Sequence, residues 1–174
     1  SMGGIVSFAY AGERPAELER LVIVDIAPEL VPAGAQRVYS GARRSDRFAS
    51  PDEAWQRARN DNAIAPDDIL RQRVINSLMR TEDGAWTYRY DRALRDPDVP
   101  RQRLEADEGW SRVANIAVPT LLIRGEVSDI LDRQIAERFC AAAPDCQLVE
   151  VAGAGHSVPL DKPEDFLAAA RTFL

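Results

Sequence analysis

The stretch Pro-Thr-Leu-Leu-Ile-Arg-Gly-Glu-Val-Ser-Asp, residues 119–129, reads as a buried β-strand followed by a loop. Its apolar run is bounded by Pro119 and Gly125, which is typical of a strand covered on both faces of a parallel sheet. Residues 21–26 (Leu-Val-Ile-Val-Asp-Ile) and 146–151 (Cys-Gln-Leu-Val-Glu-Val) have the same character. Helical patterns separate these strands, so the sequence predicts an α/β fold with parallel strands and crossover helices.

The predicted helices of this α/β part share one feature, an apolar face at helical spacing. They cover residues 2–10, a short segment around 110–113, residues 133–143, and the closing segment 163–174. Each lies before or after one of the three strands, which is the arrangement expected when helices cover both faces of a parallel sheet.

The middle of the chain, residues 29–110, has a different character because it is rich in arginine and lacks buried-strand runs. Ser50-Pro51-Asp52-Glu53 is a capping box that predicts a helix start, and a second helix is predicted over residues 66–79. Residues 86–90 (Trp-Thr-Tyr-Arg-Tyr) predict an extended segment, and residues 95–103 a loop with two prolines. This block is interpreted as a mostly helical insertion between two strands of the sheet.

Composition limits the classes of function. The 174 residues are 45% hydrophobic, enough for one domain with a sizeable core, and 28 acidic against 22 basic residues give a net charge of -6. This balance argues against a nucleic-acid partner, and no apolar run approaches the roughly 20 residues that cross a membrane. Cys140 and Cys146 are interpreted as thiols in a reducing compartment rather than as a bridge, which favours a cytoplasmic location.

The first residues, Ser1-Met2-Gly3-Gly4, match the second half of the Gly-x-Ser-x-Gly motif, with Gly3 as its last glycine. A serine at the start of a helix faces free N–H groups and the positive end of the helix dipole. The same four residues are also compatible with an expression scar that has no chemical meaning. The motif therefore gains weight only together with residues further along the chain.

Two polar residues follow predicted strands at the edge where ligands bind in open α/β sheets. Asp129 follows the strand that ends at Gly125, and His156, the only histidine, follows the last strand in a glycine-rich loop. The order Ser1, Asp129, His156 is that of a serine-hydrolase triad. Asp25, at the end of the first strand, is the alternative acid.

At these positions the chain resembles the C-terminal part of an α/β-hydrolase of the capped esterase, lactonase and carbon–carbon hydrolase type. The motifs that carry the resemblance are Ser1 to Gly4, Leu21 to Pro28, Pro119 to Asp129 and Gly153 to Pro159. The resemblance implies a hydrolase core over residues 1–28 and 111–174 and a helical cap or lid over residues 29–110. It also implies that the N-terminal half of the core is absent, so we expect a second polypeptide or a missing N-terminal segment to complete the domain.

The resemblance further implies a chemistry for each site residue. Ser1 is expected to be the nucleophile, His156 the general base and acid, and Asp129 the acid that orients the histidine. The backbone N–H of Met2 is expected to be an oxyanion-hole donor. Asp25 is the alternative acid, and neither a metal nor a cofactor is expected.

These roles predict an enzyme that cleaves a small-molecule ester, lactone or related acyl substrate through an acyl-enzyme. One alternative is an N-terminal-nucleophile hydrolase in which the free amine of Ser1 is the base. The other is a truncated hydrolase fold that binds without catalysis.

Overall fold

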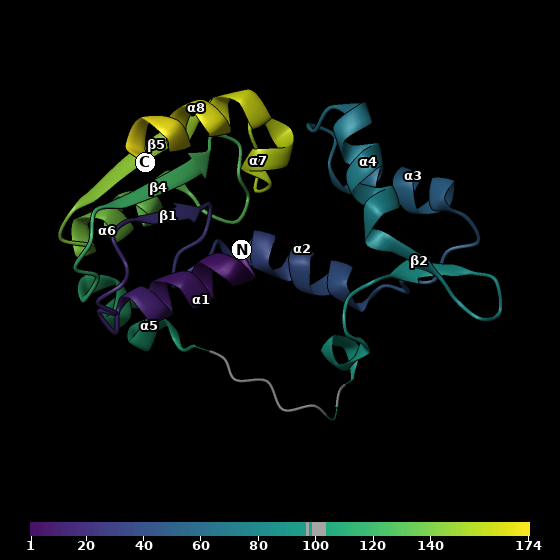
Figure 1. The fold of residues 1–174 in the computed structure, drawn as a ribbon, viewed down its shortest axis with the longest axis horizontal. Coiled ribbons are helices and arrows are strands. Elements are labelled where there is room, and N and C mark those ends of the chain that lie inside the picture. Colours follow the sequence, from purple (N-terminus) through teal and green to yellow (C-terminus); the bar gives the residue numbers. More distant parts are fainter. Residues whose placement is uncertain (97, 99–103) are drawn as a thin grey trace. The chain divides into compact units, whose positions relative to one another are not determined.

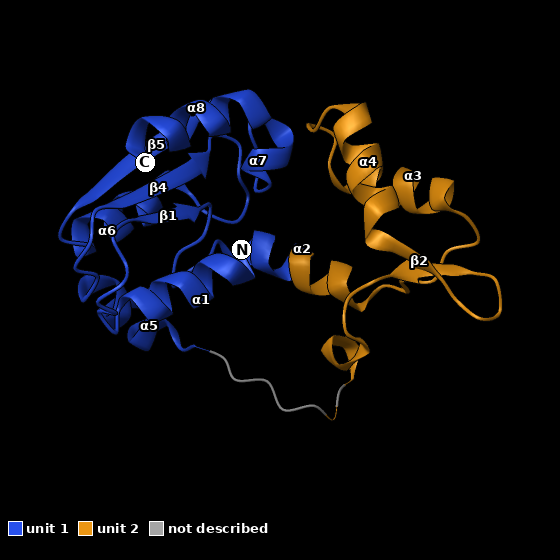
Figure 2. Cartoon of the chain, viewed as in Figure 1, with its two compact units in different colours: residues 1–37, 103–174 blue, residues 38–102 orange. Residues whose placement is uncertain are grey.

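A computed structural model describes residues 1–96, 98 and 104–174. It divides into two compact units, one formed by residues 1–37 and 103–174 and the other by residues 38–102 (Figure 2). The sequence predicts a core that ends at residue 28 and resumes at residue 111. The observed division lies instead inside helix α2 (Pro32–Arg43) and before helix α5 (Ala106–Ala114).

The first unit contains a parallel sheet. Its strands are β1 (Leu21–Val24), β4 (Thr120–Gly125) and β5 (Cys146–Val151), in the order β1-β4-β5 among the described residues. Leu21 pairs with Thr120 and Thr120 with Cys146, so the strands start in register. The helices of this unit are α1 (Met2–Ala11), the first part of α2, α5, α6 (Arg133–Ala142), α7 (Val158–Asp161) and α8 (Pro163–Phe173). The predicted parallel strands and crossover helices are confirmed.

Helices cover both faces of this sheet (Figure 1). Side chains of α1, α5 and α6 pack with Ile23 and Leu122 in one core, whereas α7 and α8 pack with Leu121 and Ile123 in another. Because successive strand residues point to opposite faces, neighbouring residues of β4 enter different cores. This explains why all six residues of β4 are buried.

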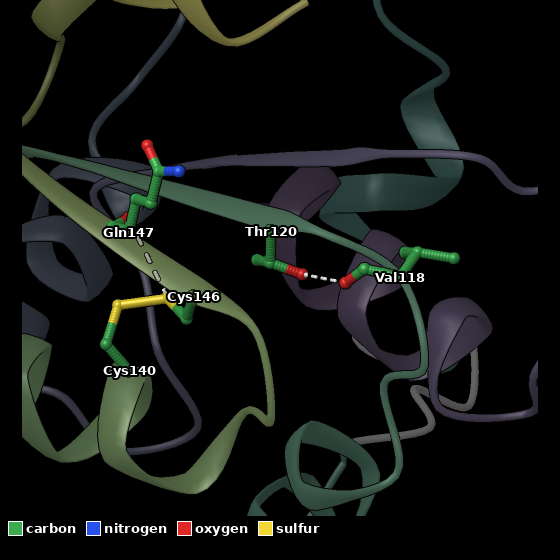
Figure 3. Close-up of a disulfide and its surroundings, with 5 residues drawn as sticks. All are labelled: Val118, Thr120, Cys140, Cys146 and Gln147. Carbon is green, nitrogen blue, oxygen red and sulfur yellow. Dashed lines mark hydrogen bonds between the residues drawn. A yellow bond between two sulfur atoms is a disulfide. The ribbon is translucent and has the colours of Figure 1, made fainter.

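A disulfide joins the end of α6 to the start of β5 (Figure 3). Cys140 and Cys146 are six residues apart, and their Cα atoms lie 4.9 Å from each other because the chain turns back between helix and strand. This separation is within the range that a disulfide spans. The expectation of two thiols is therefore wrong, and the cytoplasmic location, which rested on it, stays a prediction without that support.

The second unit consists of helices beside a short hairpin. Its elements are the end of α2, α3 (Pro51–Asp61), α4 (Asp67–Ser77), β2 (Leu78–Arg80), β3 (Trp86–Tyr88) and the 3-10 helix η1 (Arg92–Arg95). The predicted capping box is present, since Ser50 Oγ accepts from Glu53 N–H at 3.2 Å. Leu78 and Met79, expected on a helix, lie in β2 and pair with β3. The predicted loop over residues 95–103 falls largely outside the described residues.

A buried carboxylate organises this second unit. Asp46 is 7% exposed and accepts hydrogen bonds from the hydroxyls of Thr87 (3.2 Å) and Tyr90 (2.5 Å). The guanidinium of Arg92 donates to it at 2.5 Å, and that of Arg95 lies 3.3 Å away. Asp46 thus ties the segment before α3 to the hairpin and to η1.

Among the described residues, none of the helices has the length and the apolar character that crossing a membrane requires.

Candidate active site

The three strands of the first unit end at one edge of the sheet, because they are parallel and in register. Polar residues cluster directly after these strand ends: Asp25 follows β1, the loop 126–129 follows β4, and the loop 152–156 follows β5. In open α/β sheets, ligands bind at this carboxyl edge. The candidate site therefore lies here.

A direct link between the ends of β1 and β5 joins Asp25 and His156. Asp25 Oδ2 lies 2.8 Å from Nδ1 of His156, although the two residues are 131 positions apart in the sequence. The Asp25 side chain is fully buried and that of His156 is 17% exposed. A carboxylate at Nδ1 fixes the imidazole ring and leaves Nε2 available for a proton transfer.

Asp25 is held by further contacts from the loop after β4. The N–H of Gly125 donates to Oδ1 at 2.8 Å, and the hydroxyl of Ser128 donates to Oδ2 at 2.5 Å. The backbone of Asp25 has φ of 51°, in the left-handed region that aspartate tolerates better than most residues. The N–H of Asp25 still bonds to the carbonyl of Ile123 at 2.8 Å, so this backbone bend comes directly at the end of the ladder.

Asp129 has a different partner. Arg37 of α2 binds it with both ends of its guanidinium fork, Nε to Oδ2 at 2.5 Å and Nη2 to Oδ1 at 2.8 Å, and both side chains are about half exposed. The bonds from Arg37 lower the pKa of Asp129 and outweigh burial, and the nearby His156 lowers it slightly further. Asp129 therefore lies near the site without being the residue at Nδ1.

The structure thus has Asp25 in the position that the sequence order favours for Asp129. The reason lies in the turn after β4, where the N–H of Ser128 bonds back to the carbonyl of Gly125 at 3.0 Å. In this turn the Ser128 hydroxyl points at Asp25, while the side chain of the next residue, Asp129, binds Arg37 of α2. A Cβ on Gly34 of α2 would lie 1.8 Å from the Asp129 carbonyl oxygen, so the helix backbone and the loop touch.

The loop that carries His156 is fastened at three consecutive residues. Gly153 N–H donates to Glu126 at 2.8 Å, the Ala154 carbonyl accepts from Val127 N–H at 2.9 Å, and Gly155 N–H donates to Asp161 at 2.9 Å. A Cβ on Gly125 would lie 2.2 Å from the carbonyl oxygen of Gly155. The loop after β4 therefore contacts both the acid and the loop that carries the histidine.

Three supporting residues were missed by sequence reasoning: Gly125 as a packing position, Ser128 and Asp161. Glu126 also supports this edge, because its carboxylate accepts from the Gly153 N–H. The sequence signal available for Asp161 is weak, a carboxylate five residues after the histidine in an otherwise apolar turn. Ser128 carries no such signal, because its role depends on a partner 103 residues away.

Ser1 lies at the start of α1, where its carbonyl accepts from Ile5 N–H at 3.2 Å. Met2 is the first residue of α1, and its N–H is one of those without an acceptor inside the helix.

A glycine fixes this helix start against the strand end. A Cβ on Gly4 would lie 2.3 Å from Cγ2 of Ile26, the residue that follows Asp25. Gly3, which matches the last glycine of the sequence motif, has open space around its Cα within the structure. At the start of α1 the close approach is therefore made by Gly4 and not by Gly3.

Within the described ranges, no group of three or more histidine, cysteine or acidic residues is arranged to hold a metal ion.

The sheet and the carboxylate–histidine pair at its carboxyl edge define an α/β protein with a polar site at the strand ends. Residues 1–170 match the model of the alpha/beta hydrolase family, and the chain belongs to this family. The predicted family and fold class are confirmed.

Relatives give the same result. The chain is 25% identical over 184 residues to the 3-hydroxybutyrate-oligomer hydrolase of Cupriavidus necator, a match that covers 99% of this chain and 62% of the relative. It is 26% identical over 179 residues to the esterase YbfF of Escherichia coli, covering 100% of this chain and 65% of the relative. The crystal structure of E-2-(acetamidomethylene)succinate hydrolase superposes with a TM-score of 0.81 and 23% identity, covering 99% and 63% of the two chains. The chain thus spans less than two thirds of each relative.

Proposed function

We propose that the protein is a serine hydrolase that cleaves a small ester, lactone or related acyl substrate, with Ser1, His156 and Asp25 as its triad. The observation that carries the proposal is the bond between buried Asp25 and Nδ1 of His156 at the edge of the sheet where α1 begins. Asp25, the alternative acid of the sequence analysis, replaces Asp129 in the proposal, because both oxygens of Asp129 are bound by Arg37.

In the proposed reaction, Ser1 Oγ forms a bond to the acyl carbon while its proton moves to Nε2 of His156. The proton then passes to the leaving alcohol as the ester C–O bond breaks, which gives an acyl-enzyme. A water molecule repeats the sequence and releases the acid. Asp25 stabilises the imidazolium that forms during acylation and again during hydrolysis of the acyl-enzyme. The N–H of Met2 is proposed as one oxyanion-hole donor.

The substrate class rests on the relatives. Two carry esterase or oligomer-hydrolase names, and the third acts on an acetamidomethylene succinate. These names support an acyl substrate of small size, and residues 29–110 are proposed to be the cap of the hydrolase core. The identity of the acyl group is left to a substrate panel.

A completing segment is part of the proposal. Among the described strands, β1 has a neighbour on one side only, and Met2, Val6 and Tyr10 are between 46% and 68% exposed on α1. An apolar strand edge beside an apolar helix face is a surface that proteins normally cover. We propose that a preceding segment or a second polypeptide covers it. Val6→Glu should then destabilise the full-length protein more than Ser7→Glu, which alters the next position of the same helix.

The deciding experiment is covalent labelling. A fluorophosphonate probe incubated with the full-length protein should modify the peptide that carries Ser1, and the Ser1→Ala variant should not react. A panel of p-nitrophenyl esters of increasing chain length, tested beside lactones and vinylogous diketones, should identify the preferred bond. Absence of both labelling and hydrolysis in folded full-length protein would instead favour the non-catalytic binding protein.

The N-terminal-nucleophile alternative makes an opposite prediction, because it needs a free amine at Ser1. A form of the protein in which the Ser1 nitrogen belongs to a peptide bond should be inactive under that mechanism and active under the triad mechanism. Membership of the alpha/beta hydrolase family favours the triad.

A further inference from the structure

The hydroxyl of Ser128 uses its full hydrogen-bonding capacity. It donates to Asp25 Oδ2 at 2.5 Å and accepts from the N–H groups of Ile130 (3.2 Å) and Leu131 (3.3 Å). A serine hydroxyl has one proton and two lone pairs, so these three bonds fix its orientation. Since both lone pairs face N–H groups, the proton points at the carboxylate.

The oxygen that receives this proton is the one that binds the histidine. Asp25 Oδ2 accepts from Ser128 and lies 2.8 Å from His156 Nδ1, whereas Oδ1 accepts from the Gly125 N–H. One donor from the last residue of β4 and one from the loop that follows it therefore hold the two oxygens and set the plane of the carboxylate. A carboxylate on a short side chain can rotate, and these donors remove that freedom.

The need for such support follows from the local backbone. Asp25 is fully buried, so an ionised carboxylate there is costly unless donors surround it. Its positive φ is a conformation that persists only where surrounding contacts hold it. The backbone N–H of Asp25 bonds to Ile123 of the neighbouring strand β4. The support for its side chain comes from the end of β4 and from the loop that follows.

We propose that Ser128 is a positioning residue, which holds the carboxylate of Asp25 in the plane that binds Nδ1 of His156. The claim that Ser128 positions the carboxylate rests on the contacts alone. The claim that it affects turnover rests on the proposed hydrolase function. Ser128 acts through Asp25 and is not proposed to touch the substrate.

The test follows the proton on Nδ1 of His156, the ring nitrogen that lies 2.8 Å from Asp25 Oδ2. In full-length protein, the proton on Nδ1 of His156 should give a resolved downfield resonance in wild type, identified by ¹⁵N labelling of histidine and by its loss in His156→Gln. Ser128→Ala should broaden or remove this resonance, because a carboxylate held only by the Gly125 N–H can rotate and expose the proton to exchange with water. Ser128→Thr keeps the hydroxyl and should retain the resonance.

Kinetics provides the second readout. Ser128→Ala should lower kcat about 10- to 100-fold with KM nearly unchanged, as expected for loss of one bond to a charged group, and Ser128→Thr should restore most of kcat. Ser77→Ala is the matched control, because it removes a part-buried serine hydroxyl bond (2.7 Å to Val74) in the other unit. It should alter neither the resonance nor kcat.

The outcomes separate the two proposals. A retained resonance together with kcat within about twofold of wild type in Ser128→Ala would overturn the role of Ser128. If the alanine variant does not fold, Ser128→Cys gives the decision by the same criteria, since a thiol is a weak donor of similar size. A lost resonance in a protein without hydrolytic activity would support the positioning role and overturn the proposed function alone.

Discussion

The carboxylate of Asp25 and the imidazole of His156 meet at 2.8 Å across the ends of two strands that are not neighbours in the sheet. Strand β4 lies between β1 and β5. Its last residue donates to Asp25, and the loop after it bonds to the loop that carries His156. The pair is therefore an arrangement of the whole sheet edge, which depends on the register of all three strands.

Replacing the acid tests this pairing directly. Asp25→Asn keeps the size of the side chain but presents an amide that can donate to Nδ1, so the histidine is stabilised in the wrong tautomer. We expect kcat for ester hydrolysis to fall on the order of 10³- to 10⁴-fold in steady-state assays of full-length protein.

The matched variant is Asp129→Asn, which alters the residue that the sequence order favoured. Because Asp129 is half exposed and bound by Arg37, we expect a loss of less than about tenfold in kcat and only a small change in stability. A loss in Asp129→Asn as large as that in Asp25→Asn would return the role of acid to Asp129.

A methyl group at Gly125 should disturb the same edge. A Cβ there would lie 2.2 Å from the Gly155 carbonyl oxygen and 2.6 Å from that of Ala154, and both are backbone atoms that cannot swing aside. We expect Gly125→Ala to reduce the free energy of unfolding by about 2 kcal/mol or more, measured by urea denaturation followed by circular dichroism. Activity should fall with it, because the displaced loop carries His156.

Gly41→Ala is the control for that substitution. Gly41 lies inside α2, and the nearest atom that a methyl group there would meet is Nη2 of the flexible Arg44 side chain, at 3.5 Å. The same change should there stabilise the protein by up to about 1 kcal/mol, since alanine favours a helix interior over glycine. Equal destabilisation at both positions would contradict the contact argument.

The sequence predicts the sheet well and the second unit less well, for a physical reason. The strand at residues 146–151 has the predicted bounds, because a short strand between turn signals can be recognised from the local sequence. Helix α2 was not predicted, since Val31 before its first residue, Pro32, is not a capping residue and its interior contains two glycines. The three-residue strands β2 and β3 form by pairing with each other, which the local sequence does not show. Leu78 and Met79 were therefore predicted to continue the preceding helix.

The site is predictable only in part. Strand order brings Ser1, His156 and two candidate acids to one edge, and the sequence supports each as a candidate. The choice between Asp25 and Asp129 depends on the direction in which each side chain points from its turn. It also depends on the bond between Arg37 and Asp129. That competition is decided by contacts between residues about a hundred positions apart, which no local pattern encodes.

Acid should weaken the second unit through Asp46. Burial raises the pKa of this carboxyl, but hydrogen bonds from Tyr90 and Arg92 and the charge of Arg95 outweigh it, so the pKa lies below its ordinary value. The stabilisation is then complete above the unfolded pKa of about 3.9 and is lost as the pH falls through the lower folded value.

The variant Asp46→Asn removes this charge at every pH. We expect it to be about 2 kcal/mol less stable than wild type at pH 7, and the difference to shrink below about pH 4 as wild-type Asp46 takes up its proton. Urea denaturation at pH 7, 5 and 3 measures the difference. Asp61→Asn, which removes the exposed pair with Arg44, should cost less than about 1 kcal/mol, and a gap for Asp46→Asn that stays constant into acid would contradict the assigned cause.

Reduction should weaken the first unit through the bond between Cys140 and Cys146. Both cysteines pack against the core formed by α1, α5 and α6. Their disulfide joins two positions that are six residues apart in the sequence. By the chain-entropy argument a loop this short contributes about 2 kcal/mol, because the bond restricts the unfolded chain. Adding dithiothreitol to wild type should therefore lower the urea midpoint, whereas the Cys140→Ser/Cys146→Ser variant should start at that lower midpoint and not respond to the reductant. Alkylation of denatured, unreduced protein should modify neither cysteine, and recovery of two alkylated cysteines from freshly purified protein would instead support the thiols that the sequence favoured.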